Sequence, residues 1–242
     1  MSIKEILKPG DVILEAPEKT KWWQIHLKII YAGIFWFQKR IFGKNSNWKF
    51  THSTLYFDDE HIFSITFPKT KWLTIENYKN VEFSIFRPTL KDPVTNNNLN
   101  LTKKRILIMK DAADRMIGTD YDIGQLFDIA IKSLLNFEKI RKLSIFDFGK
   151  KKKVCSVGVR VCFEKMYQKE KSNSTKLLFS KLNKKKYLYD KVSNFKGIDV
   201  EATSPAHFAN TDHYNNEFKL IYENVLENNS KFQYNLKVVN LK

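Results

Sequence analysis

The sequence predicts an α+β protein, with an antiparallel β-sheet packed against helices in a single domain of 242 residues. Segments 51–57, 61–67 and 81–87 are short, apolar and closely spaced, so they can pair as neighbouring antiparallel strands. Helical periodicity is confined to other stretches, chiefly 103–117 and the residues from Cys155 onward. A hydrophobic fraction of 43% and an aromatic fraction of 14% supply a core and exclude intrinsic disorder.

The first elements follow a turn at Pro9-Gly10, which predicts a strand over 11–15. Residues 22–42 are apolar on almost every side, which predicts one or two helices within an insertion at 21–44. We expect this segment to be packed on the domain. The alternative is a helix that lies on a membrane surface or walls an apolar substrate cleft.

The strand over 51–57 alternates, so that His52 and Leu55 lie on opposite faces. A polar turn at 58–60 leads into the strand over 61–67, and a loop covers 91–101. The remaining predicted elements are a helix over 103–117 that ends at Gly118, a helix over 122–137, a helix that starts at Cys155, a solvated lysine-rich connection over 165–186, a C-terminal extension from about 187, a helix start at Ser204-Pro205, and strands over 218–222 and 233–239.

Lysine and arginine number 42 against 26 acidic residues, a net charge of +16 that suits an anionic polymer, an anionic membrane surface or nucleic acid. No nucleic-acid-binding motif is present, which argues against the last of these. The N-terminus lacks the apolar core of a secretory signal, and the longest uncharged apolar stretch, 29–37, is too short to span a membrane. We therefore expect a chain that is cytoplasmic as synthesised.

Cys155 and Cys162 are seven residues apart on one predicted helix, about 10 Å between Cα atoms, too far for a disulfide. No zinc-ligand spacing is present, and no metal or cofactor is expected. Cys155 lies at the helix start, where unpaired N–H groups favour a thiolate. A nucleophilic cysteine needs a base, and among the five histidines His52 is the one inside a strand with apolar neighbours.

Five motifs occur in a characteristic order: PGDVIL, THSTLYF, HIFSITFPKTKW, GTDYDIGQLFDI and VCSVGV. From about Pro9 to Phe163 the chain thereby resembles the circularly permuted branch of the NlpC-like cysteine peptidase superfamily, which includes YiiX-like proteins and relatives of lecithin retinol acyltransferase. The segment ATSPAHFANT resembles a tail segment of the YiiX-like branch.

The resemblance implies a circularly permuted papain-like fold in which the histidine precedes the cysteine. It assigns Cys155 as nucleophile and His52 as general base, gives Asp11 a structural role, and places Tyr121-Asp122 near the active site. The family expects a polar residue that orients the histidine. The candidates here are Ser64 or Thr66, with Glu60 or His61 as substitutes if the turn folds over the site.

Two departures from the family pattern concern activity. The first is the neutral partner of His52, because a hydroxyl orients an imidazole but does not offset its positive charge as a carboxylate would. The second is the pair Val157-Gly158 after Cys155-Ser156, where relatives are often polar or acidic. The expected function is a cysteine hydrolase, an amidase or endopeptidase acting on an amide or ester bond. Cell-wall peptide is the default substrate class, on an anionic polymer or membrane surface. The alternatives are a weak or inactive binding module and an acyl-lipid thioesterase or acyltransferase.

Overall fold

A six-stranded antiparallel sheet forms the centre of the computed structural model, which describes residues 3–17, 31–36, 38–39, 49–78, 81–89, 100–122, 154–174, 204–209 and 218–224. The strands are β1 (Val12–Glu15), β2 (His52–Asp58), β3 (His61–Ile65), β4 (Thr70–Leu73), β5 (Phe83–Pro88) and β6 (Phe218–Asn224). Their spatial order is β4-β3-β2-β1-β5-β6. The helices are α1 (Ile3–Ile6), α3 (Lys103–Asp114), α5 (Cys155–Ser174), α6 (Pro205–Ala209) and the short 3-10 helix η1 (Ile75–Tyr78). This mixed architecture confirms the predicted α+β class.

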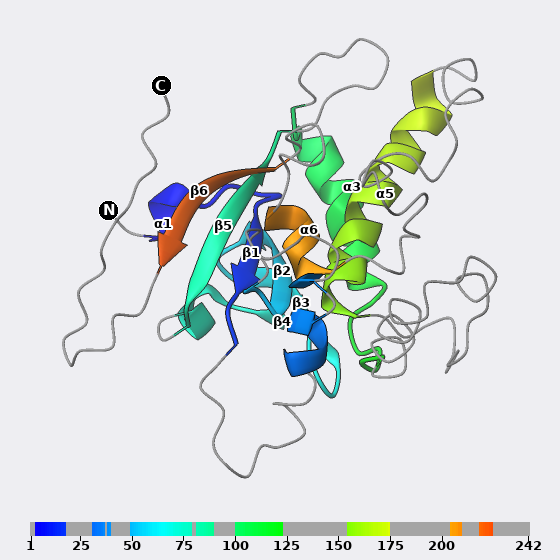
Figure 1. Cartoon of the computed structure of the whole chain (residues 1–242). Coiled ribbons are helices and arrows are strands. Elements are labelled where there is room, and N and C mark those ends of the chain that lie inside the picture. Colours follow the sequence, from blue (N-terminus) through cyan, green and yellow to red (C-terminus); the bar gives the residue numbers. More distant parts are fainter. Residues whose placement is uncertain are drawn as a thin grey trace.

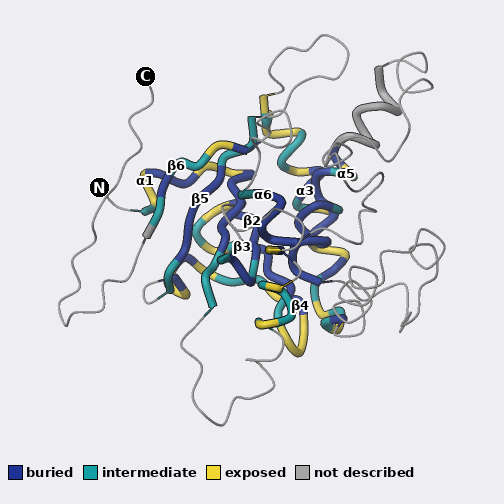
Figure 2. The backbone as a smooth tube through the Cα atoms, viewed as in Figure 1, coloured by how far each residue is buried: buried dark blue, intermediate teal, exposed yellow. Residues whose placement is uncertain are grey.

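Helices α3, α5 and α6 cover one face of the sheet, and α1 and η1 cover the other (Figure 1). Strand alternation supplies both cores, because Leu55 and Phe57 of β2 pack toward α5 while Tyr56 packs toward η1. Figure 2 shows that the buried stretches are concentrated in the central strands and in the parts of α5 and α6 that face them.

The strand register places His52 at one end of the sheet. It lies opposite Glu15 of β1, whereas Leu55 lies opposite Val12. Strand β3 pairs with β2 only as far as Ser64, which is the partner of Thr54. His52 and Ser53, the first two residues of β2, therefore lie beyond the last β2–β3 pair.

Local packing fixes α5 against this part of the sheet. A Cβ atom added at Gly158 would lie 2.1 Å from Cδ1 of Ile65, so the helix backbone rests directly on β3. Cys155, Val159, Cys162 and Phe163 belong to the core cluster beneath the helix.

Several sequence expectations are corrected or refined. The connection predicted over 165–186 is wrong as far as Ser174, because α5 continues to that residue, and 175–186 lie outside the described residues. The lysines and glutamates of this stretch are good helix formers. The 103–117 helix ends earlier, at Asp114, and turns lead to Gly118, whose φ is 81°. The short elements α1, β4 and η1 were not predicted.

Other predicted segments lie partly or wholly outside the described residues. The helix predicted over 122–137, apart from its first residue, and the strand predicted over 233–239 are outside them. Within the apolar insertion, 31–36 and 38–39 are helical. From the predicted C-terminal extension, α6 packs near β1 and β6 completes one edge of the sheet. Within the described ranges, no helix is long and apolar enough to cross a membrane.

Candidate active site

Cys155 is the first residue of α5, and its side chain is in contact with the start of β2. The thiol lies in hydrogen-bond contact with the His52 side chain and with the backbone and side chain of Ser53. The structure thus brings together the two residues, Cys155 and His52, that sequence reasoning selected as nucleophile and base.

The electrostatics of the site favour a thiolate. Burial alone would raise the pKa of Cys155. The opposing effect is larger in sum, and it comes from the charge of His52, the hydrogen bond from its ring, and the Ser53 N–H and hydroxyl groups. The pKa of Cys155 therefore lies below its ordinary value. Cys162 shows the opposite behaviour, because burial raises its pKa far above the ordinary value. Both cysteines are free and buried, so the contacts with β2, not exposure, distinguish them.

Ser64 orients the imidazole from the other side. His52 Nε2 lies 2.9 Å from Ser64 Oγ, which is fully buried on β3. Thr66, the alternative candidate, is part-exposed, and its hydroxyl donates instead to the carbonyl oxygen of Lys69 at 3.3 Å. Of the two hydroxyls left open by the sequence, the structure places Ser64 against the histidine.

Glu60 and His61, the proposed substitutes, lie at the far end of β2. The His61 ring is 2.7 Å from Asp58 Oδ1, and the Glu60 backbone N–H donates to the same oxygen at 3.0 Å. Asp58 is six residues from His52 along an extended strand, a separation of about 20 Å. The turn does not fold back onto the site.

Tyr121 approaches Cys155 from the segment after α3. Its pKa is raised well above the ordinary value by burial and then by the neighbouring Cys155, Tyr31 and Asp122. Its backbone N–H donates to the carbonyl of Pro68 at 3.0 Å, which ties this segment to the β3–β4 turn. Tyr121 therefore borders the thiol, and Tyr31 of the 31–36 helix lies near Tyr121.

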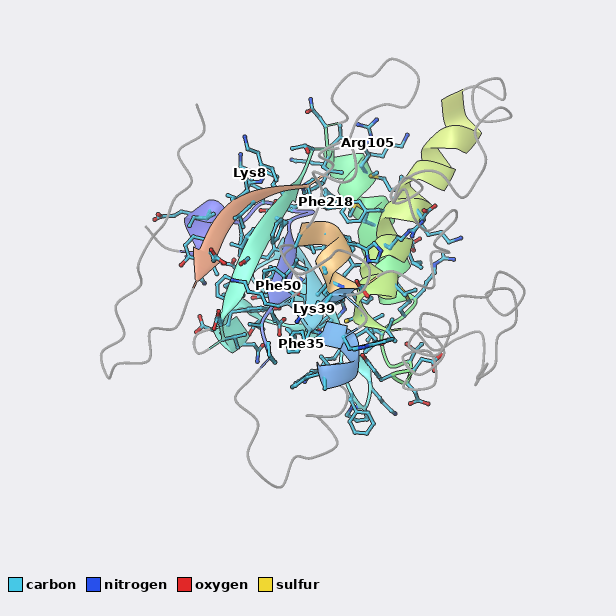
Figure 3. The ribbon with its side chains drawn as sticks, in the orientation of Figure 1. Lys8, Phe35, Lys39, Phe50, Arg105 and Phe218 are labelled. Carbon is cyan, nitrogen blue, oxygen red and sulfur yellow. The ribbon has the colours of Figure 1, made fainter. Side chains whose placement is uncertain are left out.

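Gln38 fastens the start of β2 to α6. Its side-chain amide donates to the Phe50 carbonyl at 2.7 Å and accepts from the Ala206 N–H at 2.7 Å, and the residue is fully buried. Phe50 is two residues before His52, so Gln38 restrains the chain that carries the histidine. Figure 3 shows Phe50 between Phe218 above and Lys39 and Phe35 below.

Sequence reasoning missed Ser53 and Gln38. Ser53 lies on the face of β2 that carries Leu55 and Phe57, a pattern that indicates only a small core residue. Gln38 lies in the segment over 22–42, for which helices were predicted from the apolar residues alone. An uncharged amide side chain among apolar neighbours was the available signal, because a buried amide needs partners.

No model of a known protein family matches the chain, and no curated protein aligns with it significantly. The described residues also hold no group of three or more His, Cys, Asp or Glu side chains placed to bind a metal ion.

Proposed function

We propose that the chain is a cysteine hydrolase with a circularly permuted papain-like fold of the NlpC-like type. One observation carries the proposal: a thiol at the N-terminus of a helix is in hydrogen-bond contact with a strand histidine, and its pKa is lowered. The antiparallel sheet, the helix packed on it and the order of His52 before Cys155 are compatible with that fold.

The reaction starts with proton transfer from Cys155 to His52. Nε2 of His52 faces Ser64, so Nδ1 is the ring nitrogen that remains for the thiol. In the neutral tautomer that this requires, Nε2–H donates to Ser64 Oγ and Nδ1 accepts the thiol proton. Ser64 is thus a positioning residue, and Cys155 and His52 are the catalytic pair.

The thiolate then attacks the carbonyl carbon of an amide or ester and forms a tetrahedral oxyanion. The Cys155 backbone N–H lies in the first turn of α5, where N–H groups have no intrahelical partner, so it is a donor for this oxyanion. His52 returns its proton to the leaving nitrogen or oxygen as the C–N or C–O bond breaks. Water, deprotonated by the same imidazole, hydrolyses the thioester and restores the thiol.

The substrate class is an amide or ester of a peptide or acyl group, with cell-wall peptide as the first choice. The +16 net charge suits a substrate held on an anionic polymer or membrane surface. An acyl-lipid substrate is the second candidate. Trp36 and Phe67 are 40% and 67% exposed. Trp36 lies on the 31–36 helix and Phe67 precedes Pro68; both segments contact Tyr121, which lies beside the thiol, and these side chains would give an apolar chain a surface to contact.

The test measures Cys155 directly. We expect brief iodoacetamide treatment at neutral pH to alkylate Cys155 faster than Cys162, as read by mass spectrometry. The His52→Ala variant should lose most of the difference, and Cys162→Ala is the matched control, in which Cys155 should be alkylated at its native rate. Faster labelling of Cys162, or a Cys155 rate unaffected by His52→Ala, contradicts the proposal.

Cleavage assays then distinguish an active hydrolase from an inactive binding module with the same fold. Cys155→Ala should abolish cleavage of cell-wall peptides or of p-nitrophenyl acyl esters, and His52→Ala should come close to that. If the native chain labels as expected but cleaves neither class, the neutral Ser64 partner has left a binding module on a peptidase fold.

A further inference from the structure

A cavity of about 720 Å³ lies at the end of the sheet away from Cys155. Its wall includes Asp11, Arg87 and Leu101. Asp11 is four residues before Glu15, the partner of His52, so the cavity is about 13 Å along β1 from the catalytic pair. Its size falls within the roughly 300–1,000 Å³ typical of small-molecule sites. It is therefore a second site, independent of the proposed hydrolysis.

Much of the cavity wall is apolar. Leu101, Ile106 and Leu107 contribute from α3 and the residue before its cap, and prolines 9 and 88 contribute from the strand ends. The lack of a side chain at Gly10 lets Leu101 pack against the backbone there, because a Cβ atom at this position would lie 2.2 Å from Cδ1 of Leu101. Leu107 is 65% exposed although it is a large apolar residue, which leaves an apolar surface at the mouth without a partner among the described residues.

The remaining wall is cationic. Lys8, Arg87 and Lys103 face one acidic residue, Asp11, so the charged side chains sum to 3 − 1 = +2. Asp11 is already satisfied, because its carboxylate accepts from Arg87 Nε at 2.9 Å, from Arg87 Nη2 at 2.8 Å and from the Lys8 backbone N–H at 2.8 Å. Within the described part of the chain, no acidic side chain lies within ion-pair distance of the Lys8 or Lys103 ammonium groups.

The N-terminus of α3 adds to this potential. Lys103 is the first residue of the 12-residue helix, and Thr102 caps it by accepting from the Arg105 N–H at 3.4 Å. The first N–H groups of a helix carry a partial positive charge. Figure 3 shows Lys8 and Arg105 at the upper side of the view, with Lys39 and Phe35 at the lower side.

We propose that this cavity binds an amphiphilic anion, a long-chain carboxylate whose tail lies along the Leu101–Leu107 wall and whose head meets the Lys8 and Lys103 ammonium groups. The apolar wall accounts for the tail, and the unmatched positive charge accounts for the head. A plain anion would leave the apolar wall exposed to water, and an uncharged chain would leave the lysines unpaired.

Isothermal titration with dodecanoate below its micelle concentration tests the proposal. We expect saturable binding of one dodecanoate per chain, with much weaker binding of acetate, which has no tail, and of dodecyltrimethylammonium, which has the opposite charge. Tight binding of acetate would make the cavity a simple anion site. Equal binding of the cationic amphiphile would reduce it to an apolar groove, and the absence of dodecanoate binding would also overturn the proposal.

Surface variants locate the ligand. The double variant Lys8→Glu, Lys103→Glu should weaken dodecanoate binding by about tenfold or more, since each change removes a charge-assisted contact. Lys104→Glu is the matched control, because Lys104 is the next residue of α3 and does not line the cavity. Leu107→Asp should also weaken binding, whereas Phe67→Asp, at the other end of the sheet, should not.

The proposed hydrolysis has a separate readout. Cys155→Ala should leave dodecanoate binding unchanged, and the double lysine variant should leave the alkylation rate of Cys155 unchanged. If Cys155→Ala abolished dodecanoate binding while the fold stayed intact by circular dichroism, the ligand would occupy the thiol site and this cavity would not be the binding site.

Discussion

Ser53 shows how a small residue can set the chemistry of a site. Its hydroxyl is fully buried, has no nitrogen or oxygen hydrogen-bond partner among the described residues, and lies beside the Cys155 thiol, whose pKa it helps to lower. A buried hydroxyl without a neutral partner costs free energy. That cost is offset when a thiolate forms beside it, so Ser53 favours the charged state of the nucleophile.

Replacing Ser53 with alanine should therefore raise the pKa of the Cys155 thiol. A charge-assisted hydrogen bond of ordinary strength corresponds to about one pH unit. The alkylation rate of Cys155, followed from pH 5 to pH 10, should show its midpoint shifted upward by that amount. Ser84→Ala, which removes a buried hydroxyl on β5, is the control. An unchanged midpoint in Ser53→Ala would mean that the hydroxyl only fills space.

Ser64 acts through the histidine and should have a modest effect. Its hydrogen bond to His52 Nε2 is neutral and worth about 1 kcal/mol, so Ser64→Ala should lower the rate of Cys155 alkylation at neutral pH about fivefold. The pH profile should also change shape, since the imidazole loses its fixed tautomer. Thr66→Val removes the neighbouring hydroxyl, which bonds the Lys69 carbonyl, and should leave the rate unchanged. Equal effects of the two variants would refute the assignment.

At the scale of elements, the contact between α5 and β3 sets the position of the thiol. Gly158 lies one turn after Cys155, and its missing side chain lets the helix rest on Ile65 and Phe63. This contact gives a physical reason for the Val157-Gly158 pair at which the sequence departs from the polar pattern of its proposed relatives. A larger residue would move the first turn of α5, and Cys155 with it, away from His52.

Gly158→Ala should consequently destabilise the fold and slow labelling of Cys155. The added Cβ atom would lie 2.1 Å from Ile65 Cδ1, and overpacking of this kind costs about 1–3 kcal/mol. Urea unfolding measures the loss of stability. Gly33→Ala is the matched control, because nothing lies within 4 Å of its added Cβ and alanine favours the helix that contains it. If both variants were equally stable, the close contact would not be present.

At the scale of the whole molecule, the sequence predicted the strands, the helices and the Cys155–His52 pair, whereas the residue that contacts the histidine could be identified only from the structure. Alternation in 51–57 and the helix start at Cys155 made His52 and Cys155 candidates, and the order of the five motifs selected them as a pair. The choice between Ser64 and Thr66 stayed open because they are two residues apart and share a strand face. Only the three-dimensional structure decides between them, because His52 Nε2 lies 2.9 Å from Ser64 Oγ, whereas the Thr66 hydroxyl donates to the Lys69 carbonyl. The papain-like topology stays a prediction that rests on motif order.

The polar contacts within and between α5 and α6 could not be predicted from the apolar pattern of the sequence. Arg160 on α5 is fully buried and lies 3.6 Å from Glu164 Oε1, while on α6 the Ser204 N–H donates to His207 Nδ1 at 2.9 Å. The helical stripe around Cys155 indicated only an apolar face. The structure shows instead that α5 presents a cation toward α6, because the charge of Arg160 acts on His207.

This buried histidine predicts acid sensitivity of the whole fold. Burial, followed by the charge of Arg160, lowers the pKa of His207 from 6.5 to about 3. Between these values the unfolded chain binds a proton that the folded chain does not, so stability is full above about pH 6.5 and falls as the pH drops toward 3. Urea unfolding at pH 7 and pH 5 should show a loss that is smaller in His207→Gln. His61→Gln, which changes a half-exposed histidine, should keep the native pH dependence. If His207→Gln lost as much stability as the native chain over this range, His207 would be charged in the folded protein and the contact between α6 and α5 would have to open to admit its proton.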